Sequence, residues 1–140
     1  MRLTSQQARA RFVASPVARL ATVRADGQPR LVPLVFAVDG DDLHSAVDRK
    51  PKSTTSLGRL ADIAAHPAVS LLVDHYADDW TQLWWARADG LAEVNDLTPQ
   101  VLDLLVARYP VYKLQPPPGP VVTVHVERWS GWAAGRADAG

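Results

Sequence analysis

The sequence has no cysteine, no net charge and no long apolar run. Without cysteine the chain forms neither a disulfide nor a catalytic thiol, and metal sites that need thiolates are excluded. Its 15 lysines and arginines balance its 15 aspartates and glutamates, which removes any global attraction to nucleic acid or to an anionic membrane. Any anion that binds must therefore be held by a local cluster.

No apolar run reaches the length that a membrane-spanning helix needs. Arg2, Arg9 and Arg11 stand among polar residues where a signal peptide would have an apolar stretch. We therefore expect a cytoplasmic protein. A length of 140 residues, 47% of them hydrophobic, predicts one domain, residues 1–140, that buries its core without metals or disulfides.

Short strands joined by tight turns dominate the first half of the chain. Residues 17–23 and 29–38 are strand-like runs, and the Asp26-Gly27 pair between them is a hairpin signal. A turn at residues 39–42 leads into a third strand from Leu43 to Val47. Three successive strands without helical crossovers predict an antiparallel sheet and disfavour a Rossmann-type domain.

The second half adds strands from Ala68, from Gln82 to Val94 with a bulge near Gly90, and from Val121 to Trp129. Helices are expected over Ser5 to Ala14, capped by Thr4, and over Pro99 to about Tyr109, capped by Thr98. A third helix is expected over Leu57 to Ala65, where Leu57, Leu60, Ala61 and Ala64 form one apolar stripe. The first has few apolar positions and is expected to be a peripheral lid. Residues 110–120 hold five prolines and predict a stiff extended loop. About six strands with three short helices predict a mainly β (α+β) fold, a closed or split antiparallel barrel.

A basic cluster, "DRKPKSTTS" at residues 48–56, lies just before the second expected helix. Cations there oppose the positive N-terminal end of the helix dipole. The conflict disappears if backbone N–H groups, hydroxyls and the cations converge on a bound anion. The alternative is that these side chains are simply solvated on a loop, but placement between a core strand and a helix start favours a phosphate or carboxylate site. No glycine-rich loop is present, so a P-loop is excluded.

Three of the five tryptophans, Trp80, Trp84 and Trp85, fall in "DDWTQLWW". On a strand Trp84 and Trp85 point to opposite faces, so one can enter the core while the other meets a ligand or a second subunit. Packing alone, in the core and at a dimer interface, is the alternative.

Groups for side-chain catalysis are scarce. The four histidines lack paired-ligand spacing, so no metal is expected, and the serines after Lys52 lack the context of a hydrolase nucleophile. If the protein is an enzyme, a bound cofactor is expected to carry the chemistry.

Taken in order, four stretches resemble the pyridoxamine-5′-phosphate oxidase-like FMN-binding split-barrel superfamily. They are "ARLATVRADGQPRLVPLVFAV", "DRKPKSTTSLGRLADIAAHPAVSLLVDHY", "DDWTQLWWARADG" and "GPVVTVHVERWSGW", which together span nearly the whole chain. The "KPK" segment and the tryptophan-rich segment resemble in particular the branch that uses the deazaflavin coenzyme F420. The resemblance implies a six-stranded antiparallel split β-barrel that forms a homodimer, with two cofactor sites between the subunits.

The same resemblance implies a set of cofactor-binding residues. Those bordering the ring system are Val32, Pro33 and Leu34, continued along the groove by Ser45 and Val47. Those holding the phosphate or anionic tail are Arg49, Lys50, Lys52 and Ser53. Trp80 or Trp85 would come from the partner chain, with Tyr112 and Lys113 near the substrate mouth.

The implied function is that of an F420-dependent oxidoreductase, which transfers a hydride between F420 and a small organic acceptor. The protein would align donor and acceptor and exclude water, with no indispensable catalytic side chain and Tyr112 as a candidate proton donor. FMN is the alternative cofactor, although the extra carboxylates of F420 favour three cations. The sequence is also compatible with a non-catalytic protein that binds a cofactor or tetrapyrrole, and with a purely structural dimerisation module. No nucleic-acid or membrane partner is expected.

Overall fold

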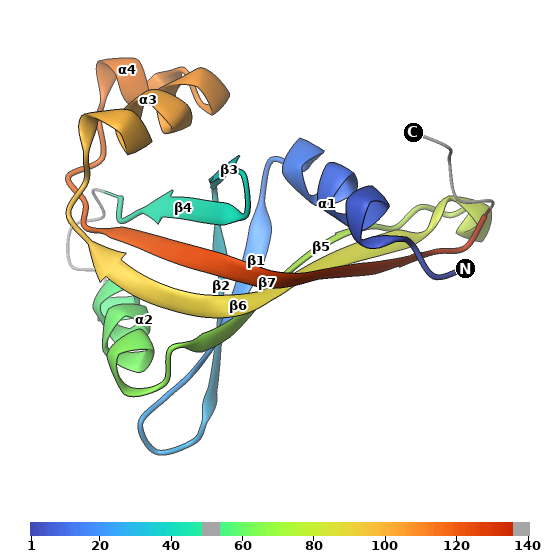
Figure 1. The fold of residues 1–140 in the computed structure, drawn as a ribbon, viewed down its shortest axis with the longest axis horizontal. Helices are drawn as coiled ribbons and strands as arrows, with labels where there is room; N and C mark the ends of the chain where they lie inside the picture. The colour runs from blue at the N-terminus through green and yellow to red at the C-terminus, as the bar shows by residue number, and fades with distance from the viewer. Residues whose placement is uncertain (49–53, 136–140) are drawn as a thin grey trace.

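The computed structural model of the chain describes residues 1–48 and 54–135, in which seven strands form one sheet in the order β2-β1-β5-β6-β7-β4-β3 (Figure 1). Every pairing is antiparallel, as predicted. The strands are β1 (Ala18–Val23), β2 (Pro29–Leu34), β3 (Ala37–Asp39), β4 (Asp42–Ala46), β5 (Ala68–His75), β6 (Trp84–Asn95) and β7 (Val121–Ala133).

The chain passes from one edge of this sheet to the other within two residues, Val35 and Phe36. The predicted single strand over residues 29–38, and with it the count of six strands, was wrong, because β2 ends at Leu34 and β3 begins at Ala37. The backbone N–H of Phe36 donates instead to the Tyr109 hydroxyl, at 3.0 Å. β2 and β3 are the two edge strands of the sheet. Because only two residues connect them, the sheet must curl until its edges lie close together. The result is a barrel that is split between β2 and β3.

The first helix, α1 (Ser5–Ala14), begins at a capping box in which Thr4 and Gln7 bond reciprocally. It is not the peripheral lid that its sparse apolar positions predict. Phe12 is fully buried and packs against Phe36 and Trp129, with ring centroids 5.1 Å and 5.4 Å away. One aromatic side chain thus anchors the helix, a contribution that a count of apolar positions underestimates.

A second, smaller core lies at the split end of the barrel. It gathers Leu105 of α3 (Pro99–Arg108) and Tyr112 of α4 (Val111–Leu114) against Ala46 and Val121. Figure 1 shows α3 and α4 above the β3–β4 corner. The cap of α3 is as predicted, with the Thr98 hydroxyl accepting the N–H of Val101 at 3.3 Å. The prediction of an extended loop over residues 110–120 was partly wrong, because α4 begins directly after Pro110. The ring of proline fixes φ at a value that suits a helix.

The longest strands, β6 and β7, pair along their whole length and run side by side across the middle of Figure 1. Their register shifts between Asp89 and Gly90, which confirms the predicted bulge. A Cβ at Gly90 would overlap the carbonyl oxygen of His125, so only glycine fits there. Among the described helices, none has the length and apolar character to span a membrane.

Candidate functional site

A cavity of about 250 Å³ opens at the split of the barrel. Its apolar wall comes from the segment before β1 and from the end of β2, and its polar wall from β4, α2 (Thr54–Ala65) and α4. The lining residues are Val17, Pro33, Leu34, Val35, Ser45, Ala46, Asp48, Arg59 and Tyr112. We call this cavity the split groove.

Arg59 of α2 is the most unusual residue of the split groove. Only 8% of it is exposed, and its Nε has no hydrogen-bond partner among the residues that the structure describes. Burial lowers the pKa of Arg59, and electrostatic interactions with Tyr112 and Asp48 partly offset this decrease. The guanidinium of an arginine nevertheless stays charged in proteins. A buried cationic donor without an acceptor is costly. The arrangement therefore suits a ligand that brings an acceptor or a negative charge.

Ser45 and Tyr112 complete the polar wall. The Ser45 hydroxyl donates to the carbonyl oxygen of Val35 at 2.8 Å, which fixes the backbone where β2 leaves the sheet. Burial and, after it, the negative charge of Asp48 raise the pKa of Tyr112. The phenol therefore stays protonated at neutral pH and is suited to donate a hydrogen bond.

The structure brings together four of the residues singled out from the sequence: Pro33, Leu34, Ser45 and Tyr112 line the split groove. Val32 belongs to the main core, and the backbone N–H of Val47 donates to Pro120 at 2.9 Å outside the groove lining. Lys113 is exposed on α4. The basic residues Arg49, Lys50, Lys52 and Ser53 lie outside the described residues; in the sequence they follow directly on Asp48, which lines the groove.

The tryptophan-rich segment lies far from the split groove within one chain. Trp80 is 74% exposed in a short 3₁₀ helix, η1 (Trp80–Gln82), and Trp85 pairs with Trp132 at the far end of β7. Ser45, in contrast, pairs with Val122 near the start of β7. Ten residues of β-strand span about 33 Å. A single chain therefore does not bring these tryptophans to the groove, and their arrival from a partner chain stays a prediction.

The sequence did not single out Arg59, because the apolar stripe of α2 predicted a buried face that matches the structure only in part. Of the stripe Leu57, Leu60, Ala61 and Ala64, Leu60 packs against the main core, but Ala61 and Ala64 are exposed, whereas Arg59 and Asp62 are buried. Charged side chains can be buried only when a partner compensates the charge. Asp62 has Arg30 as its partner, and Arg59 lines a groove in which a ligand can bind. The only signal in the sequence was an arginine and an aspartate within a helix otherwise rich in apolar residues.

Several solved structures share this fold. A FAD-binding protein from Mesorhizobium loti is 22% identical, with 94% of this chain and 95% of that chain covered and a TM-score of 0.70. A heme-binding protein from Mycobacterium smegmatis is 16% identical, covering 96% and 55% of the two chains (TM-score 0.70). The heme storage protein HutZ from Vibrio cholerae is 14% identical, covering 94% and 95% (TM-score 0.68).

Among curated proteins no significant relative was found. The family model described as pyridoxamine 5′-phosphate oxidase, however, matches residues 4–133, which is nearly the whole described chain. The match covers β1 to β7 and every residue that lines the split groove. The chain therefore belongs to the pyridoxamine 5′-phosphate oxidase family of split barrels.

Proposed function

We propose that the protein binds a phosphate-bearing flavin, FMN in the first instance, in the split groove and uses it as an oxidoreductase cofactor. The observation that carries this proposal is Arg59, a buried guanidinium in the groove whose Nε lacks an acceptor among the described residues. A phosphate or a ring carbonyl would supply that acceptor. The basic segment at residues 49–53 follows Asp48 in the sequence and is expected to add to the anion site.

The shape of the split groove favours a flat ring held at one edge. Pro33, Leu34 and Val35 supply an apolar wall, while Ser45, Arg59 and Tyr112 supply polar groups on the other side. A volume of about 250 Å³ lies below the range of pockets that enclose a whole drug-sized ligand. We infer that the rest of the cofactor extends beyond the groove, toward the N-terminus of α2 and a second copy of the chain that contributes tryptophans.

A tetrapyrrole fits this site less well than a flavin. Heme iron is held by histidine, cysteine, methionine or tyrosine, and among the described lining residues only Tyr112 belongs to that set. Its raised pKa disfavours the phenolate that would bind iron. The heme-binding relatives nevertheless make heme the second ligand to test.

F420, the cofactor that the family resemblance implies, is kept as an alternative to FMN. Of the three relatives described above, one is named for FAD and two for heme. The FAD-binding protein supports a flavin over a deazaflavin. When bound, a reduced flavin or deazaflavin supplies a hydride to a small organic acceptor. The groove residues would hold and orient the ring, and Tyr112 would donate a hydrogen bond to the ring or to the acceptor.

The test is a titration of the purified protein with FMN, riboflavin, F420 and hemin, followed by fluorescence or absorbance. We expect FMN to bind at micromolar concentration or better. Replacing Arg59→Met should weaken FMN binding by about tenfold or more through loss of a charge-assisted hydrogen bond. The matched control is Arg128→Met, at an exposed arginine of β7. Tighter binding of F420 or hemin than of FMN, or equal affinities of the Arg59→Met and Arg128→Met variants, would contradict the proposal.

A further inference from the structure

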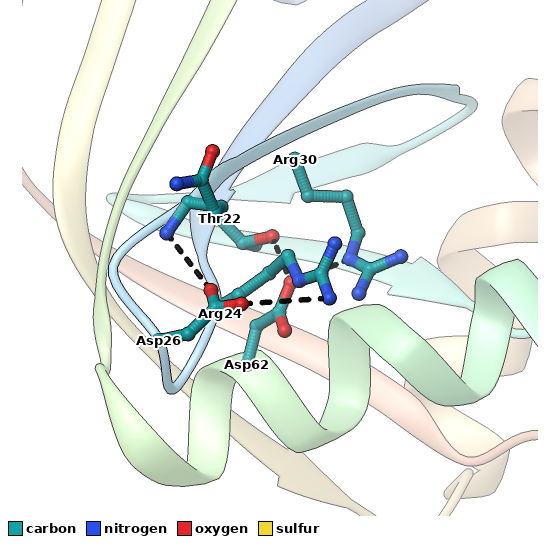
Figure 2. A network of polar contacts seen from close by, with 6 residues as sticks. Thr22, Arg24, Asp26, Arg30 and Asp62 are labelled. Atoms are coloured by element: carbon teal, nitrogen blue, oxygen red, sulfur yellow. Dashed lines mark hydrogen bonds and ion pairs between the residues drawn. The ribbon is translucent and has the colours of Figure 1, made fainter.

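A buried carboxylate ties α2 to the first hairpin of the barrel (Figure 2). The Asp62 side chain accepts hydrogen bonds from the Thr22 hydroxyl of β1 and from the Arg30 Nε of β2, each at 2.7 Å. Only 4% of Asp62 is exposed. Burial alone would raise its pKa, but the hydrogen bonds and the charges of Arg30 and Arg24 outweigh it and lower the pKa. Asp62 is therefore ionised, and hydrogen-bond donors on both β1 and β2 compensate its negative charge.

Gly58, one turn before Asp62, makes this contact possible. A Cβ at Gly58 would lie 2.7 Å from both Cζ and Nη1 of Arg30, so the guanidinium lies directly against the helix backbone. Glycine inside a helix is unfavourable, and the close approach of Arg30 explains its presence. Residues four apart share one helix face, so Gly58 and Asp62 together form the surface on which Arg30 lies. We call Thr22, Arg30, Gly58 and Asp62 the hairpin clamp.

Arg59 stands between the two helix residues of the clamp in sequence but points into the split groove. We propose that the hairpin clamp is a positioning device, which sets the rotation of α2 and thereby directs the Arg59 guanidinium into the groove. Ile63, four residues after Arg59, is buried in the main core, and Leu60 packs against the same core. Apolar contacts and the cation thus lie on adjoining sides of the helix. The clamp supplies the polar restraint on the adjacent side.

The geometry makes such a restraint necessary. A rotation of α2 by about 20° would move a group about 8 Å from the helix axis by about 3 Å, the length of a hydrogen bond. Apolar contacts are non-directional and tolerate small rotations. A pair of short hydrogen bonds to one carboxylate oxygen does not tolerate them. Thr22 and Arg30 therefore define the rotation of α2 more sharply than the apolar contacts of Leu60 and Ile63.

This inference rests on the proposed role of Arg59, but it is tested first without any ligand. Gly58→Ala should displace the Arg30 guanidinium while deleting neither charge, and Asp62→Asn should remove the acceptor charge with little change in shape. The readout is the Arg59 Nε–H resonance in a ¹H–¹⁵N NMR spectrum, identified by its loss in Arg59→Lys. We expect it to shift or broaden in both clamp variants and to stay unchanged in Ala61→Ser, a control at an exposed position of the same helix. An unchanged Arg59 resonance in Gly58→Ala would overturn the proposal, even if Asp62→Asn fails to fold.

The second readout asks whether the clamp acts through Arg59. Gly58→Ala should weaken FMN binding about tenfold in the otherwise natural protein, and by less than about twofold in the Arg59→Met background, because coupled residues are non-additive. Additive effects of the two substitutions would overturn the positioning role. Failure of the natural protein to bind FMN would instead contradict the proposed function, while the Arg59 resonance would still decide whether the clamp positions the side chain.

Discussion

The hydroxyl of Tyr109 lies 3.0 Å from the backbone nitrogen of Phe36 and 2.9 Å from its carbonyl oxygen. It also lies 2.8 Å from the carbonyl oxygen of Pro16. Phe36 occupies the two-residue passage between β2 and β3, where a sheet partner for its backbone is missing among the described residues. One phenol from the end of α3 thus takes the place of a neighbouring strand at the split of the barrel.

We expect Tyr109→Phe to destabilise the protein by about 1–3 kcal/mol, because it leaves a partly buried N–H without an acceptor. Urea unfolding measures the free-energy difference. The control is Tyr76→Phe, at an exposed tyrosine after β5, which should change the free energy of unfolding little. Equal effects of the two substitutions would mean that the Tyr109 hydroxyl does not hold the passage.

Asp62 should make the stability of the fold fall at acidic pH. Its pKa is lowered in the folded state, below the value of about 3.9 for an unfolded chain. The ion pair with Arg30 therefore contributes fully above the unfolded pKa, and the contribution is lost as the pH falls through the folded pKa.

Asp62→Asn should cost about 2 kcal/mol at pH 7, less than the loss of a fully buried ion pair, because the Arg30 side chain remains 27% exposed. Urea unfolding of both proteins between pH 7 and pH 3 measures this difference. It should shrink toward the acidic end. A difference that stays constant down to pH 3 would contradict the assignment of an ionised Asp62.

His125 should have the opposite pH dependence. Its Nδ1 lies 2.8 Å from Asp42 and its Nε2 3.2 Å from Glu93, and hydrogen bonds to these carboxylates raise the pKa of His125. The contribution is therefore present below the unfolded pKa of about 6.5 and is lost as the pH rises through the folded pKa. Because the imidazole is about half exposed, His125→Gln should cost no more than about 1 kcal/mol at pH 6.

An NMR titration of the His125 ring measures this pKa directly. We expect a value above that of His44, whose pKa is lowered mainly by burial. The stability difference between the natural protein and His125→Gln should be smaller at pH 8.5 than at pH 6. A His125 ring that titrates below 6.5 would show that Asp42 and Glu93 do not stabilise its charged form.

Lys50 and Lys52 should matter more for ligand binding than for folding. If the basic segment belongs to the anion site, Lys50→Ala combined with Lys52→Ala should weaken FMN binding by about tenfold or more and leave the free energy of unfolding within about 0.5 kcal/mol. Arg128→Ala, at an exposed arginine of β7, is the control. Unchanged FMN affinity in the double variant would assign these lysines to a solvated loop.

Local signals in the sequence were sufficient for most of the secondary structure. Thr4 and Thr98 start helices at the predicted residues because a capping hydroxyl acts on its own next turn. The Asp26-Gly27 turn and the Gly90 bulge are likewise where they were predicted. Other boundaries depended on distant residues: β2 ends early because Tyr109 binds Phe36, and α1 is held because Phe12 meets Trp129.

The sequence by itself determined a cysteine-free, charge-balanced antiparallel barrel, together with the apolar strand and the serine that line the split groove. Only the tertiary structure decided that Arg59 faces this groove, that Asp62 and Gly58 hold Arg30, and that Trp85 lies far from the cavity along β6. The physical reason is that helical periodicity identifies the buried face of a helix only when the residues buried on that face are apolar. A buried charge is stable only next to its partner, and in this protein the partners of α2 lie on strands more than thirty residues away in the sequence.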